Sequence, residues 1–377
     1  MTQRWRPRRR LRVLHVVDSL AIGGVQRVLV DLVERTGDEL EHRICCIRRA
    51  GVLAAPLEAL GARVDVVGAA SGRTLALIAP LVRLCRRLSP DVVHARNWGT
   101  IEAVLAARIA RVPAVLYGEH GPGSWSGRRR HRGRRAVAAV AHAVVAVSNA
   151  VRDYLLEVGV RADKITVIRN GVDTQRFRPR PDRERLRRER GLPPEALLIG
   201  AVNRLDPIKN CDALIAAFQD VAARHPDSRL VLLGDGPLRE RLCGEIRSRS
   251  LDGRAAILGS CDDVADWLAT MDVFAHASFA EGLSNAVLQA MAVGLPVVAT
   301  DLAANRELVV DGVSGRLVDS GTPIELADAL SFYCGDAAAR RAHGAAGRQR
   351  AEVEFPLPRM IDGYRSLYRR VSAGSGS

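Results

Sequence analysis

The chain alternates between short apolar runs and stretches of helical periodicity. In its first half the runs are rich in β-branched residues, and the segments between them repeat apolar residues every three or four positions. The predicted strands are 12–17, 43–47, 63–67, 91–94, 114–117, 143–147 and 165–168. Continuous apolar strands that alternate with helices indicate a parallel sheet covered on both faces, a Rossmann-like α/β fold.

The same alternation begins again after a break. Residues 170–195 contain Arg-Pro steps and a Pro-Pro pair, and we interpret them as the linker and the first helix of a second domain. The strands predicted there are 197–202, 229–233, 255–258, 273–275 and 296–299. We therefore expect two doubly wound parallel-sheet domains, 1–172 and 173–355, then a C-terminal helix that crosses back and a flexible tail, 356–377. Such folds bind ligands at the carboxyl ends of their strands, here in a central cleft that the two domains face.

The charge of the chain is unevenly distributed. There are 56 Lys+Arg against 42 Asp+Glu, for a net charge of +14, and only Lys164 and Lys209 are lysines. Residues 1–170 hold 29 basic and 14 acidic residues, whereas residues 171–377 hold 27 and 28. A coding preference explains arginine over lysine but not this asymmetry. A basic first domain indicates an anionic partner: nucleic acid, a membrane surface or a phosphorylated substrate.

We expect a cytoplasmic chain without a membrane span. The longest Ala/Val-rich stretch, around 136–147, is interrupted by His142 and is shorter than the roughly 20 residues that a span needs. The apolar run near the N-terminus is stopped by Asp18, which argues against a signal peptide. Seven scattered cysteines without a C-x-x-C pair predict reduced thiols and no zinc site.

Two candidate anion-binding segments each follow the first strand of a domain. Gly23-Gly24 opens a helix, where glycine permits close backbone approach and the first amides are unpaired, although a simple turn explains the pair equally well. Arg204 and Lys209 flank a proline turn and could hold a diphosphate between them; the alternative is a pair of surface cations.

The segment FAEGLSNAVLQAMAVGLPVVA, residues 279–299, is the most informative. Ser284 is a suitable N-cap for a helix that ends at Gly294, so the amides of Asn285 and Ala286 would face a ligand. Glu281 lies just before this helix, where a carboxylate could order sugar hydroxyls. The Gly234-Asp235-Gly236-Pro237 run, taken alone, indicates a turn.

These motifs in this order resemble the retaining nucleotide-sugar glycosyltransferases of family 4, which have the GT-B fold. The resemblance is carried by residues 279–299, preceded by NRLDPIK at 203–209 and GDGP at 234–237, and it extends over nearly the whole chain. Gly23-Gly24, GEHG at 118–121 and NGVD at 170–173 are similar to the branch that acts in bacterial exopolysaccharide assembly.

The resemblance implies a role for each of several residues. Arg204 and Lys209 would hold the donor diphosphate, helped by the amides of residues 284–286 and by Gly23 and Gly24. Glu281 would contact the donor sugar, and His120 would face the anomeric centre; these two are the predicted catalytic residues. The residues expected around the nucleoside are Gly234, Asp235, Gly259, Ser260 and Gln289. The family usually has glutamate where this chain has Gln289, and the change predicts weaker ribose binding or an altered nucleotide preference.

The resemblance also implies a metal-independent transfer without a cofactor, and the sequence contains no D-x-D triplet. The basic first domain would take a glycan or lipid-linked acceptor. An anionic membrane surface could bind through Arg128, Arg129, Arg130, Arg132, Arg134 and Arg135.

The alternatives are a nucleic-acid-binding protein, a nicotinamide dehydrogenase and a catalytically idle sugar-nucleotide-binding protein. An aromatic content of 4% without basic/aromatic interleaving argues against nucleic acid, and the missing G-x-G-x-x-G fingerprint argues against a dehydrogenase. A catalytically idle protein that binds sugar nucleotides stays open because of Gln289.

Overall fold

The computed structural model describes residues 9–69, 75–121, 128–319 and 322–374, with only the backbone described at Trp98 and 128–130. The chain divides into two compact units. The first comprises Met1–Arg169 together with Met360–Ser377, and the second comprises Asn170–Arg359. The division thus lies three residues before the predicted boundary, and most of the C-terminal helix belongs with the first unit, which agrees with the expected crossing back.

The described part of the first unit contains one sheet of seven parallel strands, in the order β3-β2-β1-β4-β5-β6-β7. The strands are β1 (Leu11–Ser19), β2 (Leu40–Arg49), β3 (Arg63–Val66), β4 (Val92–Arg96), β5 (Ala114–Glu119), β6 (Ala143–Ala146) and β7 (Ile165–Val167). Since β1 has β2 on one side and β4 on the other, the order of connections reverses between β1 and β4. The predicted parallel sheet is confirmed.

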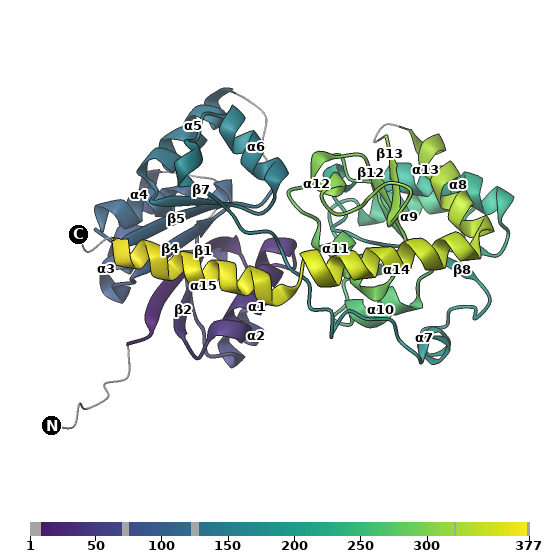
Figure 1. The fold of residues 1–377 in the computed structure, drawn as a ribbon, viewed down its shortest axis with the longest axis horizontal. Coiled ribbons are helices and arrows are strands. Elements are labelled where there is room, and N and C mark those ends of the chain that lie inside the picture. The colour runs from purple at the N-terminus through teal and green to yellow at the C-terminus, as the bar shows by residue number, and fades with distance from the viewer. Residues whose placement is uncertain (1–8, 70–74, 122–127, 320–321, 375–377) are drawn as a thin grey trace. The chain divides into compact units, whose positions relative to one another are not determined.

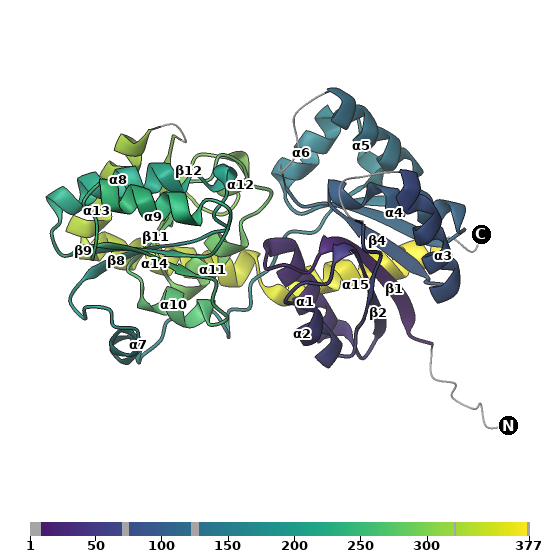
Figure 2. The same cartoon turned by 180° about the vertical axis from the view of Figure 1, so that it is seen from behind.

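Helices cover both faces of this sheet, as its two-sided apolar strands require. The helices that follow the strands are α1 (Gly24–Thr36), α2 (Ala54–Ala59), α3 (Ile78–Leu88), α4 (Ile101–Ile109), α5 (Arg128–Val140) and α6 (Asn149–Glu157). Helix α1 lies on one face together with the C-terminal helix α15 (Leu357–Ala373), while α4 and α5 lie on the other (Figures 1 and 2).

The described part of the second unit contains a six-stranded parallel sheet, in the order β10-β9-β8-β11-β12-β13. The strands are β8 (Leu197–Val202), β9 (Ser228–Leu233), β10 (Ala255–Gly259), β11 (Val273–His276), β12 (Val297–Thr300) and β13 (Gly315–Val318). Here the order of connections reverses between β8 and β11. A doubly wound sheet binds its ligands at this kind of position.

One face of the second sheet carries the main apolar core of the unit. Helices α8 (Cys211–Arg224), α9 (Arg239–Ser248) and α13 (Pro323–Gly335) pack there, α8 and α9 over β9 and β10 and α13 over β11, β12 and β13. The remaining helices of this unit are α7 (Arg183–Glu189), α10 (Val264–Thr270), α11 (Asn285–Val293), α12 (Ala303–Arg306) and α14 (Ala337–Glu354). Helices α10, α11 and α14 lie on the side of the sheet opposite α8 and α13 (Figure 1).

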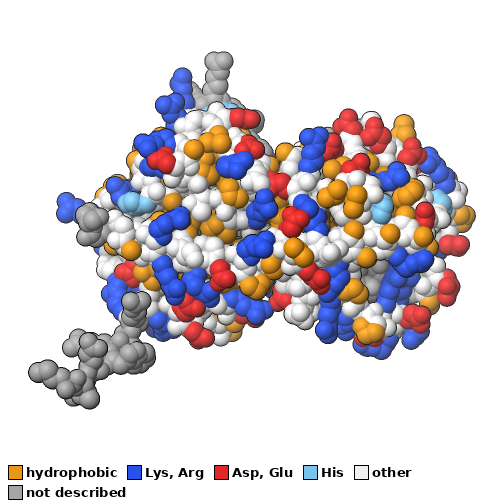
Figure 3. All heavy atoms as spheres, viewed as in Figure 1, with side chains coloured by type: hydrophobic (Ala, Val, Ile, Leu, Met, Phe, Trp, Pro, Cys, Tyr) orange, Lys and Arg blue, Asp and Glu red, His pale blue; other side chains and the backbone are white. Residues whose placement is uncertain are grey.

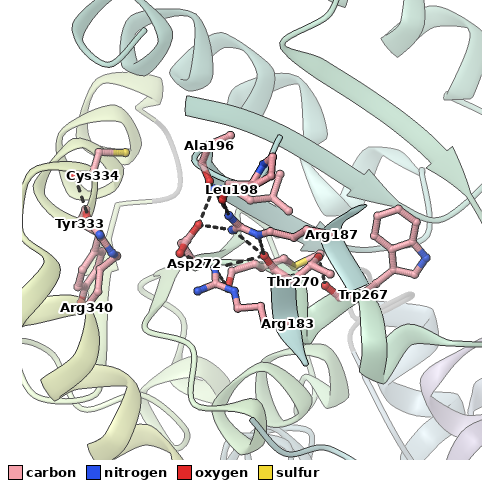
Figure 4. A network of polar contacts seen from close by, with 12 residues as sticks. Arg183, Arg187, Ala196, Leu198, Trp267, Thr270, Asp272, Tyr333, Cys334 and Arg340 are labelled. Atoms are coloured by element: carbon pink, nitrogen blue, oxygen red, sulfur yellow. Dashed lines mark hydrogen bonds and ion pairs between the residues drawn. The ribbon is translucent and has the colours of Figure 1, made fainter. Parts of the chain in front are cut away.

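A polar network at the amino ends of β8 and β11 fixes α7 to the sheet (Figure 4). The buried guanidinium of Arg187 donates to the carbonyls of Thr270, Pro194 and Ala196 and to the carboxylate of Asp272, at 2.7–2.9 Å. Asp272 also accepts from the amide of Leu198 at 2.7 Å. Because its N–H groups are all matched, this buried arginine is a structural element of the unit.

The face of the first sheet beneath α15 is polar where a core is usually apolar. His15, His94 and Arg96 lie on this face, and each is at most 1% exposed. Nε2 of His15 lies 3.0 Å from Nδ1 of His42, and His42 Nε2 lies 2.9 Å from the Thr36 hydroxyl on α1. Tyr368 of α15 closes the row, with its hydroxyl 2.8 Å from His94 Nδ1.

This polar face predicts that acid destabilises the first unit. Burial and the charge of Arg96 lower the pKa of His15, His42 and His94, that of His42 to about 4. Below pH 6.5 the unfolded chain therefore binds protons that the folded unit excludes, and the free energy of unfolding decreases as the pH is lowered. For His42 alone, the free energy of unfolding at pH 5 is about 2 kcal/mol lower than at neutral pH.

Hydrogen exchange at pH 7 and pH 5, corrected for intrinsic rates, checks this expectation. Amides of β1, β2 and β4 should lose more protection than those of β8 and β9, which serve as the internal reference. Equal changes in the two sheets would contradict it.

Candidate active site

The predicted donor-binding residues of the second unit lie where its sheet reverses order. Arg204 and Lys209 follow β8, and Glu281 follows β11, the strand that neighbours β8 in the sheet. Parallel strands deliver their carboxyl ends to one edge, so residues 72 positions apart in sequence become neighbours. The amide of Phe279 donates to the carbonyl of Ile208 at 2.9 Å and ties the two loops together.

Lys209, Glu281 and His276 form a single cluster. Lys209 Nζ lies 2.5 Å from Glu281 Oε1, and His276 Nε2 lies 2.9 Å from the same oxygen. The His276 side chain is buried at the end of β11, while those of Lys209 and Glu281 are 21% and 11% exposed. Sequence reasoning missed His276, although a polar residue ending the apolar run of β11 is a signal for it.

The Glu281 carboxylate stays ionised over the whole physiological range. Burial alone would raise its pKa, but the hydrogen bond with His276 and the Lys209 ammonium outweigh that effect and lower the pKa to about 2. A group with this pKa does not act as a general acid near pH 7. It can accept hydrogen bonds from hydroxyl groups and balance the charge of Lys209.

Arg204 also has a carboxylate partner. Its guanidinium Nε lies 2.5 Å from Asp206 Oδ2, and the side chain is 69% exposed. Each of the two predicted diphosphate-binding cations is therefore paired in the absence of ligand. Since Arg204 is largely in solvent, its ion pair is weak and easily exchanged for a phosphate.

The two glycines of the 234–237 turn are required by packing between loops. A Cβ at Gly234 would lie 1.7 Å from the Asn203 carbonyl oxygen, and one at Gly236 would lie 2.4 Å from that of Leu205. Gly234 also has φ of +139°, a conformation that favours glycine. These contacts hold the loop that carries Arg204 against the loop after β9.

The remaining predicted nucleoside residues fall in two places. Gly234 donates from its amide to the Gly259 carbonyl at 2.8 Å, so Gly234, Asp235 and Gly259 are adjacent, and exposed Ser260 follows β10. Gln289 is instead half-buried in α11. Sequence reasoning missed Arg239, which lies beside two of these residues. Its Nη1 is 4.0 Å from Asp235 Oδ2 and would lie 3.1 Å from a Cβ placed on Gly259.

Helix α11 begins as the sequence predicts. Ser284 is its N-cap and accepts from the Val287 amide at 3.4 Å, and Gly294 ends the helix in the left-handed conformation. Asn285 and Ala286 are the first two helical residues, so their amides have no carbonyl partner within the helix. This helix start lies three residues after Glu281 and presents its positive end beside the cluster.

In the first unit, Gly23 and Gly24 begin α1 directly after β1, and His120 follows β5. Gly23 is extended, with φ of −179°, so the backbone does not require glycine there. The amide of His120 donates to Asn97 Oδ1, 2.9 Å away in the loop after β4. Burial and the Arg96 charge lower the pKa of His120, so its imidazole is neutral at pH 7 and does not serve as a cation.

The prediction of a basic docking face on α5 is wrong at Arg134. This side chain is fully buried, and its Nε donates to Glu119 Oε2 at 2.7 Å; Tyr117 donates to the same oxygen. The pair anchors α5 to the end of β5. Arg132 and Arg135 are exposed, whereas the side chains of Arg128, Arg129 and Arg130 lie outside the described residues.

The excess positive charge also does not form one continuous patch on the face that Figure 3 draws. Figure 3 shows Lys and Arg side chains scattered among Asp and Glu over both units. None of the helices in the described ranges is long and apolar enough to cross a bilayer.

Comparison with known proteins gives matches over both units. Residues 22–176 match the model for Glycosyltransferase Family 4, and residues 194–336 match the model for Glycosyl transferases group 1. The D-inositol 3-phosphate glycosyltransferase of Stackebrandtia nassauensis is 32% identical over 309 residues, which cover 74% of this chain and 68% of that protein.

Two further relatives have names that specify a process or an acceptor. The lipopolysaccharide core biosynthesis mannosyltransferase LpsB of Rhizobium meliloti is 26% identical over 91% of this chain and 99% of its own. An Escherichia coli UDP-Gal:alpha-D-GlcNAc-diphosphoundecaprenol alpha-1,3-galactosyltransferase is 30% identical over 63% of this chain and 65% of its own.

The solved structures show the same fold. Anabaena Alr3699/HepE in complex with UDP and glucose has a TM-score of 0.84 at 25% identity, covering 96% of this chain and all of that one. Sucrose-phosphate synthase from Thermosynechococcus elongatus has a TM-score of 0.80 at 20% identity, covering 97% and 100%. The two parallel-sheet units, the two family models and the identity to curated enzymes agree: this chain belongs to glycosyltransferase family 4 and has the GT-B fold.

Proposed function

We propose that this protein is a retaining glycosyltransferase that moves a sugar from a nucleotide-diphosphate sugar to a hydroxyl of a glycan or lipid-linked acceptor. The observation that carries the proposal is the cluster of Lys209, Glu281 and His276 at the reversal point of the second sheet. The names of the relatives support polysaccharide or glycolipid assembly as the process. Structural neighbours solved with UDP and with UDP-glucose support the donor class.

The donor diphosphate would bind between Lys209, Arg204 and the start of α11. Binding exchanges the Arg204–Asp206 pair for a phosphate contact and adds the phosphate charge beside Lys209. The ionised Glu281 would accept hydrogen bonds from the sugar hydroxyls and so orient the anomeric carbon. His276 holds Glu281 in place from the end of β11.

The transfer step needs no nucleophile from the protein. The bond between the anomeric carbon and the diphosphate oxygen breaks, and a bond to the acceptor oxygen forms on the same face of the sugar. The acceptor proton passes to the departing diphosphate, whose negative charge Lys209, Arg204 and the positive end of α11 stabilise. His120 would act as a neutral hydrogen-bonding group near the reacting carbon.

A catalytically idle sugar-nucleotide-binding protein is the second candidate, favoured only by Gln289 in place of the usual glutamate. Donor hydrolysis or transfer, measured after a thermal-shift panel of UDP-, GDP- and ADP-sugars, separates the two. A stabilising donor that is neither hydrolysed nor transferred, with any acceptor offered, would identify the idle protein. No stabilisation by any donor would contradict both candidates.

The cluster predicts opposite effects on nucleotide binding for two substitutions. Lys209→Met removes a phosphate contact and should weaken nucleoside diphosphate binding by about tenfold or more. Glu281→Gln frees Lys209 from its ion pair, so nucleoside diphosphate binding should be kept or strengthened while sugar transfer is lost. Titration calorimetry together with a transfer assay measures both. Equal weakening of binding by the two substitutions would contradict these roles.

Restoring a carboxylate at position 289 is expected to strengthen donor binding. If Gln289 accepts a ribose hydroxyl, Gln289→Glu makes that hydrogen bond charge-assisted and should lower the donor Kd by roughly tenfold. Gln175→Glu, an exposed position in the same unit, controls for the added charge. The same Kd for Gln289→Glu and wild type would argue that ribose binds elsewhere.

We propose an anionic membrane surface as a further partner of the first unit, through the arginines of α5 other than Arg134. Arg132→Glu combined with Arg135→Glu should reduce sedimentation with vesicles that contain phosphatidylglycerol, and added salt should reduce it in wild type. The exposed pair Arg185 and Arg188, changed in the same way, provides the control. Unchanged sedimentation of the α5 variant would refute this surface.

A further inference from the structure

Arg96 is a buried arginine without a carboxylate partner. It is the last residue of β4, it is 1% exposed, and it forms no ion pair with any carboxylate of the described residues. Among the described residues, its Nε and Nη1 have no hydrogen-bond partner, and Nη2 makes one long contact, 3.5 Å, to the hydroxyl of Tyr368. Its guanidinium carbon lies 5.3 Å from the centre of the Tyr364 ring, a contact that leaves the N–H groups unmatched.

The other two buried arginines of the described residues each have a carboxylate partner. Arg187 donates to four oxygen-bearing partners, and Arg134 forms a buried pair with Glu119. A buried charge without an opposite charge beside it strongly destabilises a fold. A residue of this kind is therefore expected mainly at a functional site.

The Tyr368 hydroxyl links Arg96 to His94. It accepts from Arg96 Nη2 at 3.5 Å and lies 2.8 Å from His94 Nδ1. The other ring nitrogen, His94 Nε2, is buried and has no hydrogen-bond partner among the described residues.

Two of these unpartnered nitrogens lie against the backbone at Gly118, the residue that pairs with Arg96 across β4 and β5. A Cβ at Gly118 would lie 2.8 Å from His94 Nε2 and 3.0 Å from His120 Nε2, which also has no hydrogen-bond partner among the described residues. The Arg96 guanidinium and the two imidazoles thus belong to one buried cluster at the carboxyl edge of the first sheet. The cluster carries a fixed positive charge that no carboxylate of the described residues balances.

We propose that Arg96, His94 and His120 form an anion site in the first unit that binds a phosphoryl group of a substrate. An oxyanion supplies the negative charge that this cluster lacks and accepts from the free N–H groups of the guanidinium, which is well suited to phosphate. The carboxyl end of β4 lies at the reversal point of the first sheet, where doubly wound folds admit ligands.

The inference rests on the proposed function only for the source of the phosphoryl group. A glycosyl transfer of this kind offers two sources, the diphosphate of the donor and a phosphate or diphosphate of the acceptor. The chemistry that Arg96 recognises is the same in both, and the experiment separates them.

The test follows the imidazole resonances of the full chain by NMR while inorganic pyrophosphate is added. The signals of His94 and His120, assigned by single substitution, report on this site, and the same titration in Lys209→Met removes the contribution of pyrophosphate bound at the second unit. We expect them to shift in wild type, with a Kd at least about tenfold weaker in Arg96→Met and partly recovered in Arg96→Lys. Arg87→Met, an exposed arginine of the same unit, should bind as wild type does.

Thermal unfolding gives an independent readout. Arg96→Met removes an unpaired buried charge and should raise Tm, whereas Arg187→Met breaks a satisfied network and should lower it. If Arg96→Met lowers Tm as Arg187→Met does, and the His94 and His120 signals do not respond to pyrophosphate, Arg96 is structural and the proposal is overturned. Unchanged pyrophosphate affinity in Arg96→Met overturns it as well.

Two further measurements then identify whether the phosphoryl group belongs to the donor or to the acceptor. If the phosphoryl group belongs to the donor, Arg96→Met weakens nucleoside diphosphate binding, and a saturating nucleoside diphosphate abolishes the pyrophosphate shifts. If it belongs to the acceptor, nucleoside diphosphate affinity is unchanged and pyrophosphate still shifts both histidines in the saturated protein. A wild-type chain that transfers no sugar but shows these shifts would refute the proposed function and leave the anion site intact.

Discussion

The parallel direction of the strands is the constraint on which both candidate sites depend. Each sheet carries its strand ends to one edge, and the order of connections reverses beside the first strand of each unit. Lys209 and Glu281 meet because β8 and β11 are neighbours, not because they are close in sequence. Arg96 and Gly118 meet for the same reason across β4 and β5. A site built in this way needs little from its loops beyond the right residue after each strand.

The sequence could predict whatever depends on neighbouring residues in the chain. The Ser284 cap, the end of α11 at Gly294 and every strand except β13 follow from local periodicity and capping, and the structure agrees with each of these. Strand β13 (Gly315–Val318) is not among the predicted strands. The close approach of Gly234 to the Asn203 carbonyl, in contrast, is a property of two loops. Sequence reasoning identified the turn there but not the contact that makes glycine necessary.

Partners across strands could not be predicted in the same way. Lys209 and Glu281 are 72 positions apart and pair only because their two loops fold together. The contacts of Asp206 with Arg204 and of His276 with Glu281 join residues two and five positions apart, and sequence reasoning did not identify them. Arg134 belongs to an arginine-rich run that has every mark of a solvated face, yet Glu119 and Tyr117 make its burial favourable. Charge counting along a helix therefore overstated the basic surface of the first unit. The role of a charged side chain was decided by whether its hydrogen-bonding capacity is matched.

The C-terminal helix gives the chain an order of assembly that its linear sequence hides. Residues 360–377 belong to the first unit, although the whole second unit is synthesised before them. Tyr364 and Tyr368 of this helix cover the Arg96 and His94 face, so a nascent chain exposes that charged face until these two residues have been synthesised. A chain truncated at Arg169 would retain the seven-stranded sheet without its closing layer. The first unit to be made is thus the last to be completed.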